Sequence, residues 1–226
     1  MKTELYPTLD ITYPKNPSRL WAVPLLIVFK IIAILPAEVF LGLVSIVILI
    51  LSVINAAYVL LTGRYWLVAW DFNLTIAHYY VRIHSFLYGL TDKYPLFTKG
   101  WEQVFKLEFN RPTTSNRFFA FPLIGLVVRI ILMIPFMVFA QLVNYAAALA
   151  VFLVAWFFVL FKGRYPETAY ELAQDSIRLT LSTFFYLSGM SDNYPSFKIS
   201  MNHKNLKILA LVLAVLMMIG SNLGKK

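Results

Sequence analysis

Two very long apolar runs, Leu20–Leu61 and Phe118–Phe161, constrain this chain more than any other feature. A helix of roughly 40 residues would be about 60 Å long, twice the thickness of the hydrocarbon core of a bilayer, which is about 30 Å. Hydrophobic residues make up 60% of the chain and charged residues only 14%, against roughly 25% charged residues in ordinary soluble domains. The sequence therefore predicts a helical membrane protein.

The apolar runs open two copies of one repeated unit. RLWAVPLLIVFKIIAILP (Arg19–Pro36) matches RFFAFPLIGLVVRIILMIP (Arg117–Pro135), with one extra residue in the second copy. TDKYPLF begins at Thr91, and the similar SDNYPSF begins at Ser191. We therefore predict a tandem duplication. The predicted segments are a polar tail (1–18), repeat 1 (19–98), a linker (99–116), repeat 2 (117–198) and a hydrophobic C-terminal helix (199–226).

Breaker residues near the middle of each run favour a turn there. With turns in PAEVFLG (Pro36–Gly42) and PFMVFAQ (Pro135–Gln141), each run would fold as a hairpin of two membrane helices. The alternative is an in-plane helix over Leu20–Leu35 followed by one span over Ala37–Leu61. Hairpins place most Lys and Arg residues on one side, as the positive-inside rule prefers. We therefore expect hairpins in parallel repeats, with the N-terminus and the basic loops in the cytoplasm.

An amphipathic helix is predicted after each hairpin. Between Trp66 and Leu90 the polar residues are spaced by three or four, which gives one narrow polar stripe on an apolar helix. Such a helix suits the membrane interface, with its stripe toward water or toward a polar cleft. The stripe comprises Asp71, Thr75, His78, Arg82 and Ser85 in the first copy, and Glu171, Asp175, Arg178 and Ser182 in the second.

Two short motifs recur at the boundaries of these helices, GRY after each apolar run and (T/S)D-x-YP after each striped helix. Glycine favours the left-handed position that ends a helix, arginine is favoured at the carbonyl end, and tyrosine prefers the membrane interface. The Thr/Ser-Asp pair turns the chain, and proline keeps the residue before it out of the helix. We expect both motifs to end helices and attach the chain to the membrane face. Headgroup binding by the GRY arginines and partner docking by the turns are the alternatives. The residues are Gly63, Arg64, Tyr65, Asp92, Tyr94 and Pro95, with Gly163, Arg164, Tyr165, Asp192, Tyr194 and Pro195.

Lys30 and Arg129 align between the copies and lie deep in apolar sequence. A charge inside a membrane costs about 2.5–3.5 kcal/mol on insertion scales and therefore suggests a function. One interpretation is a polar cleft between the repeats. The other is that both side chains extend to the membrane surface. The candidate cleft comprises Lys30, Arg129, Asp71, Asp175 and Arg178.

The sequence contains no recognisable catalytic or metal-binding constellation. Cysteine is absent, and His78, His84 and His203 lack metal-ligand spacing. Phosphate-binding, nucleophile-elbow and zinc-protease motifs are also absent. We therefore expect no enzyme activity, cofactor or metal. The net charge of +9 comes without a Lys/Arg-rich run, which favours contact with anionic lipid rather than nucleic acid.

The order of these features resembles a membrane family known as domain of unknown function 4389. The resemblance rests on an arginine before a proline-containing apolar run, then GRYP, an arginine-bearing helix and (T/S)D-x-YP-x-F. It covers both copies. The second copy has the full GRYP at Gly163–Pro166, whereas the first has Trp66 in place of the proline. The resemblance implies fold and membrane residence, and no activity.

Together these observations predict an all-α, polytopic protein of the inner membrane. It would contain two units, each a helical hairpin with an amphipathic interfacial helix, and a C-terminal membrane helix. We expect a non-catalytic accessory or scaffold subunit of a membrane complex, whose partners are membrane lipids and a membrane protein. The alternative is a small transporter or lipid-binding protein that uses the polar cleft between the repeats.

Overall fold

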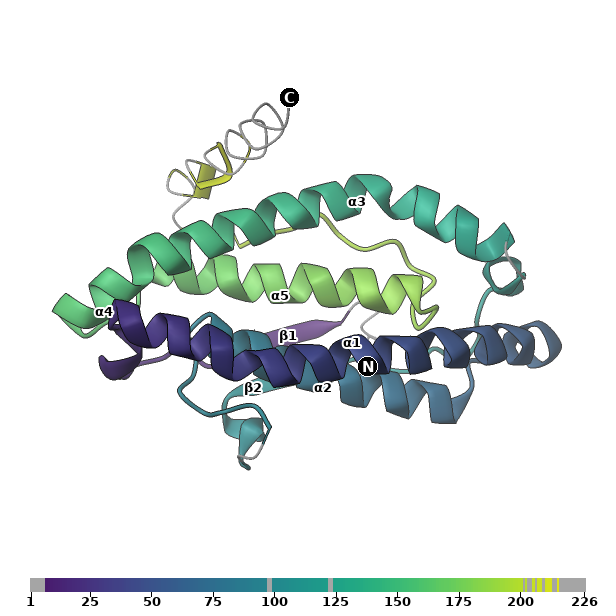
Figure 1. Cartoon of the computed structure of the whole chain (residues 1–226). Helices are drawn as coiled ribbons and strands as arrows, with labels where there is room; N and C mark the ends of the chain where they lie inside the picture. Colours follow the sequence, from purple (N-terminus) through teal and green to yellow (C-terminus); the bar gives the residue numbers. More distant parts are fainter. Residues whose placement is uncertain are drawn as a thin grey trace, which may run out of the picture.

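Each long apolar run forms one continuous helical path in the computed structural model of the chain (Figure 1). The first path is α1 (Pro24–Thr62), a single helix of 39 residues. The second is α3 (Ile124–Leu149), which continues through the π-helix η4 (Ala150–Ala155) into α4 (Trp156–Lys162). The predicted hairpins are therefore wrong, and so is the division of the first run into two separate helices.

The structure describes residues 7–96, 99–121 and 124–200, and after these residues 202, 205, 207, 208, 210–212 and 215. Most of the predicted C-terminal helix lies outside the described residues. The other elements are β1 (Thr8–Ile11), η1 (Leu20–Ala22), α2 (Leu67–Leu87), η2 (Trp101–Gln103), β2 (Phe105–Glu108), η3 (Arg117–Ala120) and α5 (Glu167–Leu187).

Pro36 and Pro135 lie inside α1 and α3 without ending either helix. A proline inside a helix removes one backbone hydrogen bond and costs about 3 kcal/mol. Inside a bilayer, a turn at this place would leave several backbone groups unpaired, which would cost more. The helix therefore continues through the proline, and the breaker signal was overestimated.

The π-helix η4 absorbs a one-residue difference between the repeats. Repeat 2 has one residue more than repeat 1 between its helix proline and its GRY motif. A π-helical turn holds this additional residue without ending the helix. Both paths then end at a left-handed glycine, Gly63 with φ 70° and Gly163 with φ 65°, which confirms the predicted role of the GRY glycines.

The two helical paths run antiparallel and meet at both ends. A Cβ atom added to Gly163 would lie 2.8 Å from Nη2 of Arg19, and one added to Gly63 would lie 3.4 Å from Nη2 of Arg117. The start of each path therefore lies beside the end of the other. This corrects the expectation of parallel repeats. Arginines therefore lie at both ends of the molecule, whereas the hairpins would have gathered the basic residues on one side.

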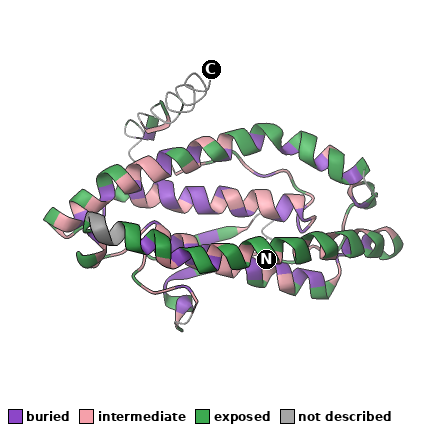
Figure 2. Cartoon of the chain, in the orientation of Figure 1, coloured by how far each residue is buried: buried purple, intermediate pink, exposed green. Residues whose placement is uncertain are grey.

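Two stretches, Val28–Thr62 and Ile124–Lys162, are long and apolar enough to cross a membrane. Their large apolar side chains are mostly exposed, and Figure 2 shows this along almost the whole of α1. Buried side chains concentrate in α2 and α5, which carry much of the core. If both long paths cross a bilayer, they cross it in opposite directions, as inverted repeats do.

The polar stripes of α2 and α5 are covered in part by the segments that follow each repeat, whereas Asp71 and Thr75 of the α2 stripe are exposed. The ring of His78 lies 5.6 Å from the ring of Phe105 in β2, between ring centroids. In repeat 2, Glu171 forms an ion pair of 2.5 Å with Lys207. The covered parts of the stripes therefore contact the linker and the segment after repeat 2, whereas we expected the whole of each stripe to face water or a cleft.

The N-terminal tail and the linker form a short antiparallel sheet, which the all-α prediction missed. The register pairs Thr8 with Glu108 and Ile11 with Phe105. Alternate side chains of both strands are buried, as expected for strands with one face on a core. The fold is therefore mainly helical, with one two-stranded sheet that joins the tail to the linker.

The continuity of α1 can be tested by a distance measurement between spin labels. Phe29 and Leu49 are both exposed, and the chain has no native cysteine. We expect labels on Phe29→Cys and Leu49→Cys to lie about 30 Å apart, since 20 residues of helix rise by that length. A hairpin would instead place them at the separation of neighbouring helices, about 10 Å, and pulsed electron paramagnetic resonance distinguishes the two.

Candidate functional site

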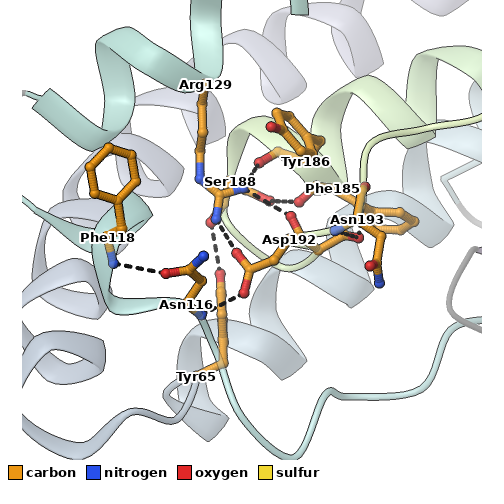
Figure 3. Close-up of polar contacts among 10 residues, drawn as sticks. Tyr65, Asn116, Phe118, Arg129, Phe185, Tyr186, Ser188, Asp192 and Asn193 are labelled. Carbon is orange, nitrogen blue, oxygen red and sulfur yellow. Dashed lines mark hydrogen bonds and ion pairs between the residues drawn. The ribbon is translucent and has the colours of Figure 1, made fainter. Parts of the chain in front are cut away.

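Arg129 lies at the centre of a buried polar site in repeat 2 (Figure 3). Its side chain projects from α3 toward the C-terminal end of α5, and the residue is 5% exposed. Nη1 donates hydrogen bonds to the carbonyl oxygens of Tyr186, at 2.6 Å, and Ser191, at 2.9 Å, and Nη2 forms an ion pair with Asp192. The carbonyl end of a helix favours a cation, so the helix and the carboxylate together compensate the buried charge.

Lys30 occupies the corresponding position in repeat 1. It is also 5% exposed, and its ammonium lies 4.5 Å from the ring centroid of Phe86 and 5.8 Å from that of Trp21. A Cβ atom added to Gly89, at the end of α2, would lie 3.7 Å from Nζ. Asp92 interacts electrostatically with this ammonium. The two sites thus share a cation from the long helix and a helix end with an aspartate from the same repeat.

Each site is completed by the GRY tyrosine of the other repeat. Tyr165 donates to the carbonyl oxygen of Tyr88 at 2.6 Å, and Tyr65 donates to that of Ser188 at 3.2 Å. Tyr88 and Ser188 are the residues that cap α2 and α5, where helix carbonyls have no partner within the helix. These tyrosines therefore join the two repeats, a role that the interface prediction missed.

The buried tyrosines are neutral hydrogen-bond donors. Burial raises the pKa of Tyr65 to about 12, although Asn73 donates a 3.0 Å hydrogen bond to its hydroxyl and opposes the shift. Burial also raises the pKa of Tyr165, and nearby tyrosines add to the effect. Both phenols keep their proton at neutral pH, as their hydrogen bonds to carbonyl oxygens require.

The aspartates of the (T/S)D-x-YP motif join each helix end to the start of a repeat. Asp92 accepts a hydrogen bond from the backbone N–H of Ser18 at 3.0 Å, and Asp192 accepts one from Asn116 at 2.7 Å. Ser18 and Asn116 directly precede the two arginines that open the repeats. The motif therefore holds the first residues of a repeat beside the turn that ends the same repeat.

The remaining residues of this motif turn the chain as predicted. The backbone N–H of Lys93 donates to Thr91 Oγ1 at 3.2 Å, and that of Asn193 donates to Ser191 Oγ at 3.2 Å. Pro95 and Pro195 are buried. Tyr94 donates to the carbonyl oxygen of Ala33 in α1 at 2.9 Å, and Tyr194 packs 6.2 Å from Phe136 in α3. Phe197 returns to the same apolar surface, 5.2 Å from Phe136, whereas Phe97 lies outside the described residues.

The structure does not gather the predicted cleft residues into one cleft. Lys30 and Arg129 belong to separate sites, and Asp71 is exposed on α2. Asp175 and Arg178 form an ion pair of 2.9 Å with each other on α5. The second oxygen of Asp175 accepts the backbone N–H of Ser200 at 2.7 Å, so this pair holds the following segment in place.

Other predicted sites receive no support from the geometry. Arg64 and Arg164 are exposed, and their headgroup-binding role stays a prediction. Within the described residues no group of three histidines or acidic residues could hold a metal ion.

The partner of Arg129 could have been found from the sequence, because an aspartate recurs at the same place in both copies of the turn motif.

Comparison with known proteins confirms the duplication. The model of a family described as a domain of unknown function, DUF4389, matches residues 24–99 and 124–198. No curated protein and no solved structure matches the chain. The match covers the long helix, the striped helix and the turn of each repeat, which carry the Lys30 site and the Arg129 site.

Tyr165→Phe tests the contact between the repeats. Removing the hydroxyl leaves the carbonyl of Tyr88 without this donor, so we expect a loss of about 1–3 kcal/mol of stability. Tyr145→Phe is the matched control, because Tyr145 is exposed and its change should stay within about 0.5 kcal/mol. Thermal unfolding in detergent measures both. Equal unfolding temperatures for the two variants would contradict a joining role for Tyr165.

Arg129→Met tests the buried ion pair. We expect a loss of about 3–5 kcal/mol, since Asp192 would keep a largely buried charge without its partner. The double variant with Asp192→Asn should recover part of this loss. Lys106→Met is the control, because the Lys106–Glu108 pair is exposed and such pairs contribute about 0–1 kcal/mol. Similar losses for Arg129→Met and Lys106→Met would show that Arg129 does not stabilise the fold.

Proposed function

Since the chain belongs to the DUF4389 family and carries two copies of its domain, we propose that it is an integral membrane protein with a non-catalytic, accessory role. In this proposal α1 packs against a membrane protein partner, and the Lys30 and Arg129 sites hold the two repeats together. Membrane residence is supported by the two long apolar stretches, Val28–Thr62 and Ile124–Lys162. The inner membrane is the expected location.

The chain covers much less of α1 than of its counterpart in repeat 2, which supports this proposal. Only 6% of the most apolar stretch of α1 is buried, against 28% of the corresponding stretch of α3 to α4. None of residues 38–54 in α1 is buried. An apolar helix face that its own chain leaves uncovered is suited to lipid or to another membrane helix.

Side-chain size explains why the two helices differ. Ala146 and Ala147 of α3 are fully buried, packed with Leu172 of α5. Counting from the two helix prolines, the corresponding residues of α1 are Val47 and Ile48. Small residues let membrane helices approach closely, whereas the larger ones keep α1 apart from its own chain. The long helix whose middle its own chain leaves uncovered, α1, is the one we assign to partner binding.

The non-catalytic part of the proposal is supported by how the polar groups are used. Arg129, Asp192 and both GRY tyrosines are bonded to backbone groups or to each other. The half-buried ring of His84 is stacked on that of Tyr80, and desolvation lowers its pKa to about 4, so it is neutral near pH 7. These groups serve packing in the present arrangement, and none is a solvated acid–base pair.

Gly42→Leu tests the partner surface of α1. A Cβ atom at Gly42 would meet nothing within 4 Å, so the chain itself should accept the larger side chain. A partner helix packed against this glycine would be displaced. We expect wild-type protein, purified in mild detergent from its native membrane, to retain a stoichiometric partner that Gly42→Leu loses at an unchanged unfolding temperature.

A photo-crosslinker at Leu43 gives an independent test with a matched control. Leu43 in α1 and Leu153 in η4 are both 62% exposed. The proposal predicts a crosslinked partner from Leu43 and only lipid adducts from Leu153. Lipid adducts from both positions, with no retained protein, would contradict the accessory role.

A further inference from the structure

The two pseudo-equivalent sites open onto cavities of very different size. The cavity beside Lys30 has a volume of about 50 Å³, whereas the cavity beside Arg129 has a volume of about 570 Å³. Cavities that bind small molecules typically measure about 300–1,000 Å³. Only the cavity beside Arg129, which we call the repeat 2 cavity, falls in this range.

Two aromatic side chains account for the difference. Phe152 and Trp156 line the small cavity, on the second helical path. Counted back from the GRY glycines, their counterparts on α1 are Ser52 and Ala56, which line the repeat 2 cavity. The same architecture is thus filled by aromatic rings in one copy and left open by small residues in the other. A ligand that took the place of those rings would have to be largely apolar.

The repeat 2 cavity also has a polar end. Arg129, Asp192 and Asn116 line it there, beside Ser115. The hydroxyl oxygen of Ser115 is buried and has no hydrogen-bond partner, which is unfavourable unless a ligand or water supplies one. In repeat 1 the residue at this place is Pro17, which has no hydroxyl. The open cavity and the unpaired hydroxyl therefore occur together, in the same copy.

We propose that the repeat 2 cavity binds one acyl chain of a membrane lipid, with the ester group at Ser115. The chain would lie along Ser52 and Ala56, next to the exposed apolar face of α1. Arg129 is engaged by Asp192 and by two carbonyl oxygens, so its charge is already compensated. An ester-linked chain therefore suits the site better than the carboxylate of a free fatty acid.

The test uses the full chain, stripped of lipid in mild detergent, and native mass spectrometry. The probes are 1-palmitoyl-lysophosphatidylglycerol, which carries one ester-linked chain, and palmitate. We expect the wild-type chain to bind one equivalent of the lysolipid, and palmitate to bind about tenfold more weakly, a difference of about 1.4 kcal/mol. Equal binding of the two probes would overturn the role of the ester.

The variant Ser52→Phe with Ala56→Trp gives the repeat 2 cavity the two aromatic side chains that fill the small cavity. This variant should bind the lysolipid about tenfold more weakly or not at all. Ile50→Phe with Ile54→Trp is the matched control, because these residues are exposed on α1 and do not line the cavity. Undiminished binding by the filled variant, or equal loss in the control, would overturn the proposal. The same holds if only detergent occupies the wild-type chain.

The converse variant protects the test against a folding failure. Phe152→Ser with Trp156→Ala should enlarge the small cavity and add a second, weaker equivalent of lysolipid. If the filled variant does not unfold cooperatively, Ser52→Phe alone replaces it.

Ser115→Ala tests the contact with the ester. It should weaken lysolipid binding and leave palmitate binding unchanged. If this variant binds both probes as the wild type does, Ser115 does not contact the ligand. None of these measurements depends on a protein partner. Lipid binding in the repeat 2 cavity can therefore be shown even if the accessory role is wrong.

Discussion

The fold depends on an exchange of contacts between the ends of the two repeats. Each striped helix ends with carbonyl groups that lack a partner within the helix, and the tyrosine of the opposite repeat donates to one of them. Each long helical path ends at a glycine that lies beside the arginine which opens the other repeat. Neither repeat can complete these helix ends alone, so the duplication is a structural requirement of this arrangement.

The buried cations follow from the same exchange. Lys30 and Arg129 lie at the carbonyl ends of α2 and α5, where the helix dipole favours positive charge. Asp192 compensates Arg129 directly, and the aromatic rings near Lys30 attract its ammonium. A charge that would be costly in isolation thus becomes a fixed part of the junction between long helix, helix end and turn.

Much of the architecture could be predicted from repetition in the sequence. The duplication, the left-handed glycines of GRY and the turns of the (T/S)D-x-YP motif follow from local preferences that tertiary contacts did not override. The hairpins were wrong because Pro36 and Pro135 were read with the rules of soluble helices. In apolar surroundings an unpaired backbone costs more than an internal proline.

The sites were harder to predict because they depend on the packing of one repeat against the other. Nothing local in the sequence indicates that Tyr65 reaches Ser188 or that Tyr165 reaches Tyr88. The predicted cleft was wrong for the same reason. Asp175 and Arg178 form an ion pair with each other on α5 and do not face Lys30 and Arg129. The unequal cavities became recognisable only when Ser52 and Ala56 could be compared with Phe152 and Trp156 in space.

One set of spin-label distances shows directly whether the two repeats are antiparallel. Leu20, Phe118 and Phe161 are exposed and lie at the ends of the two helical paths. We predict a short distance between labels at Leu20 and Phe161, and a distance between Leu20 and Phe118 that approaches the length of the helix, about 60 Å. The reverse result, with Leu20 close to Phe118 and far from Phe161, would show that the repeats are parallel and that the contacts between their ends are not formed.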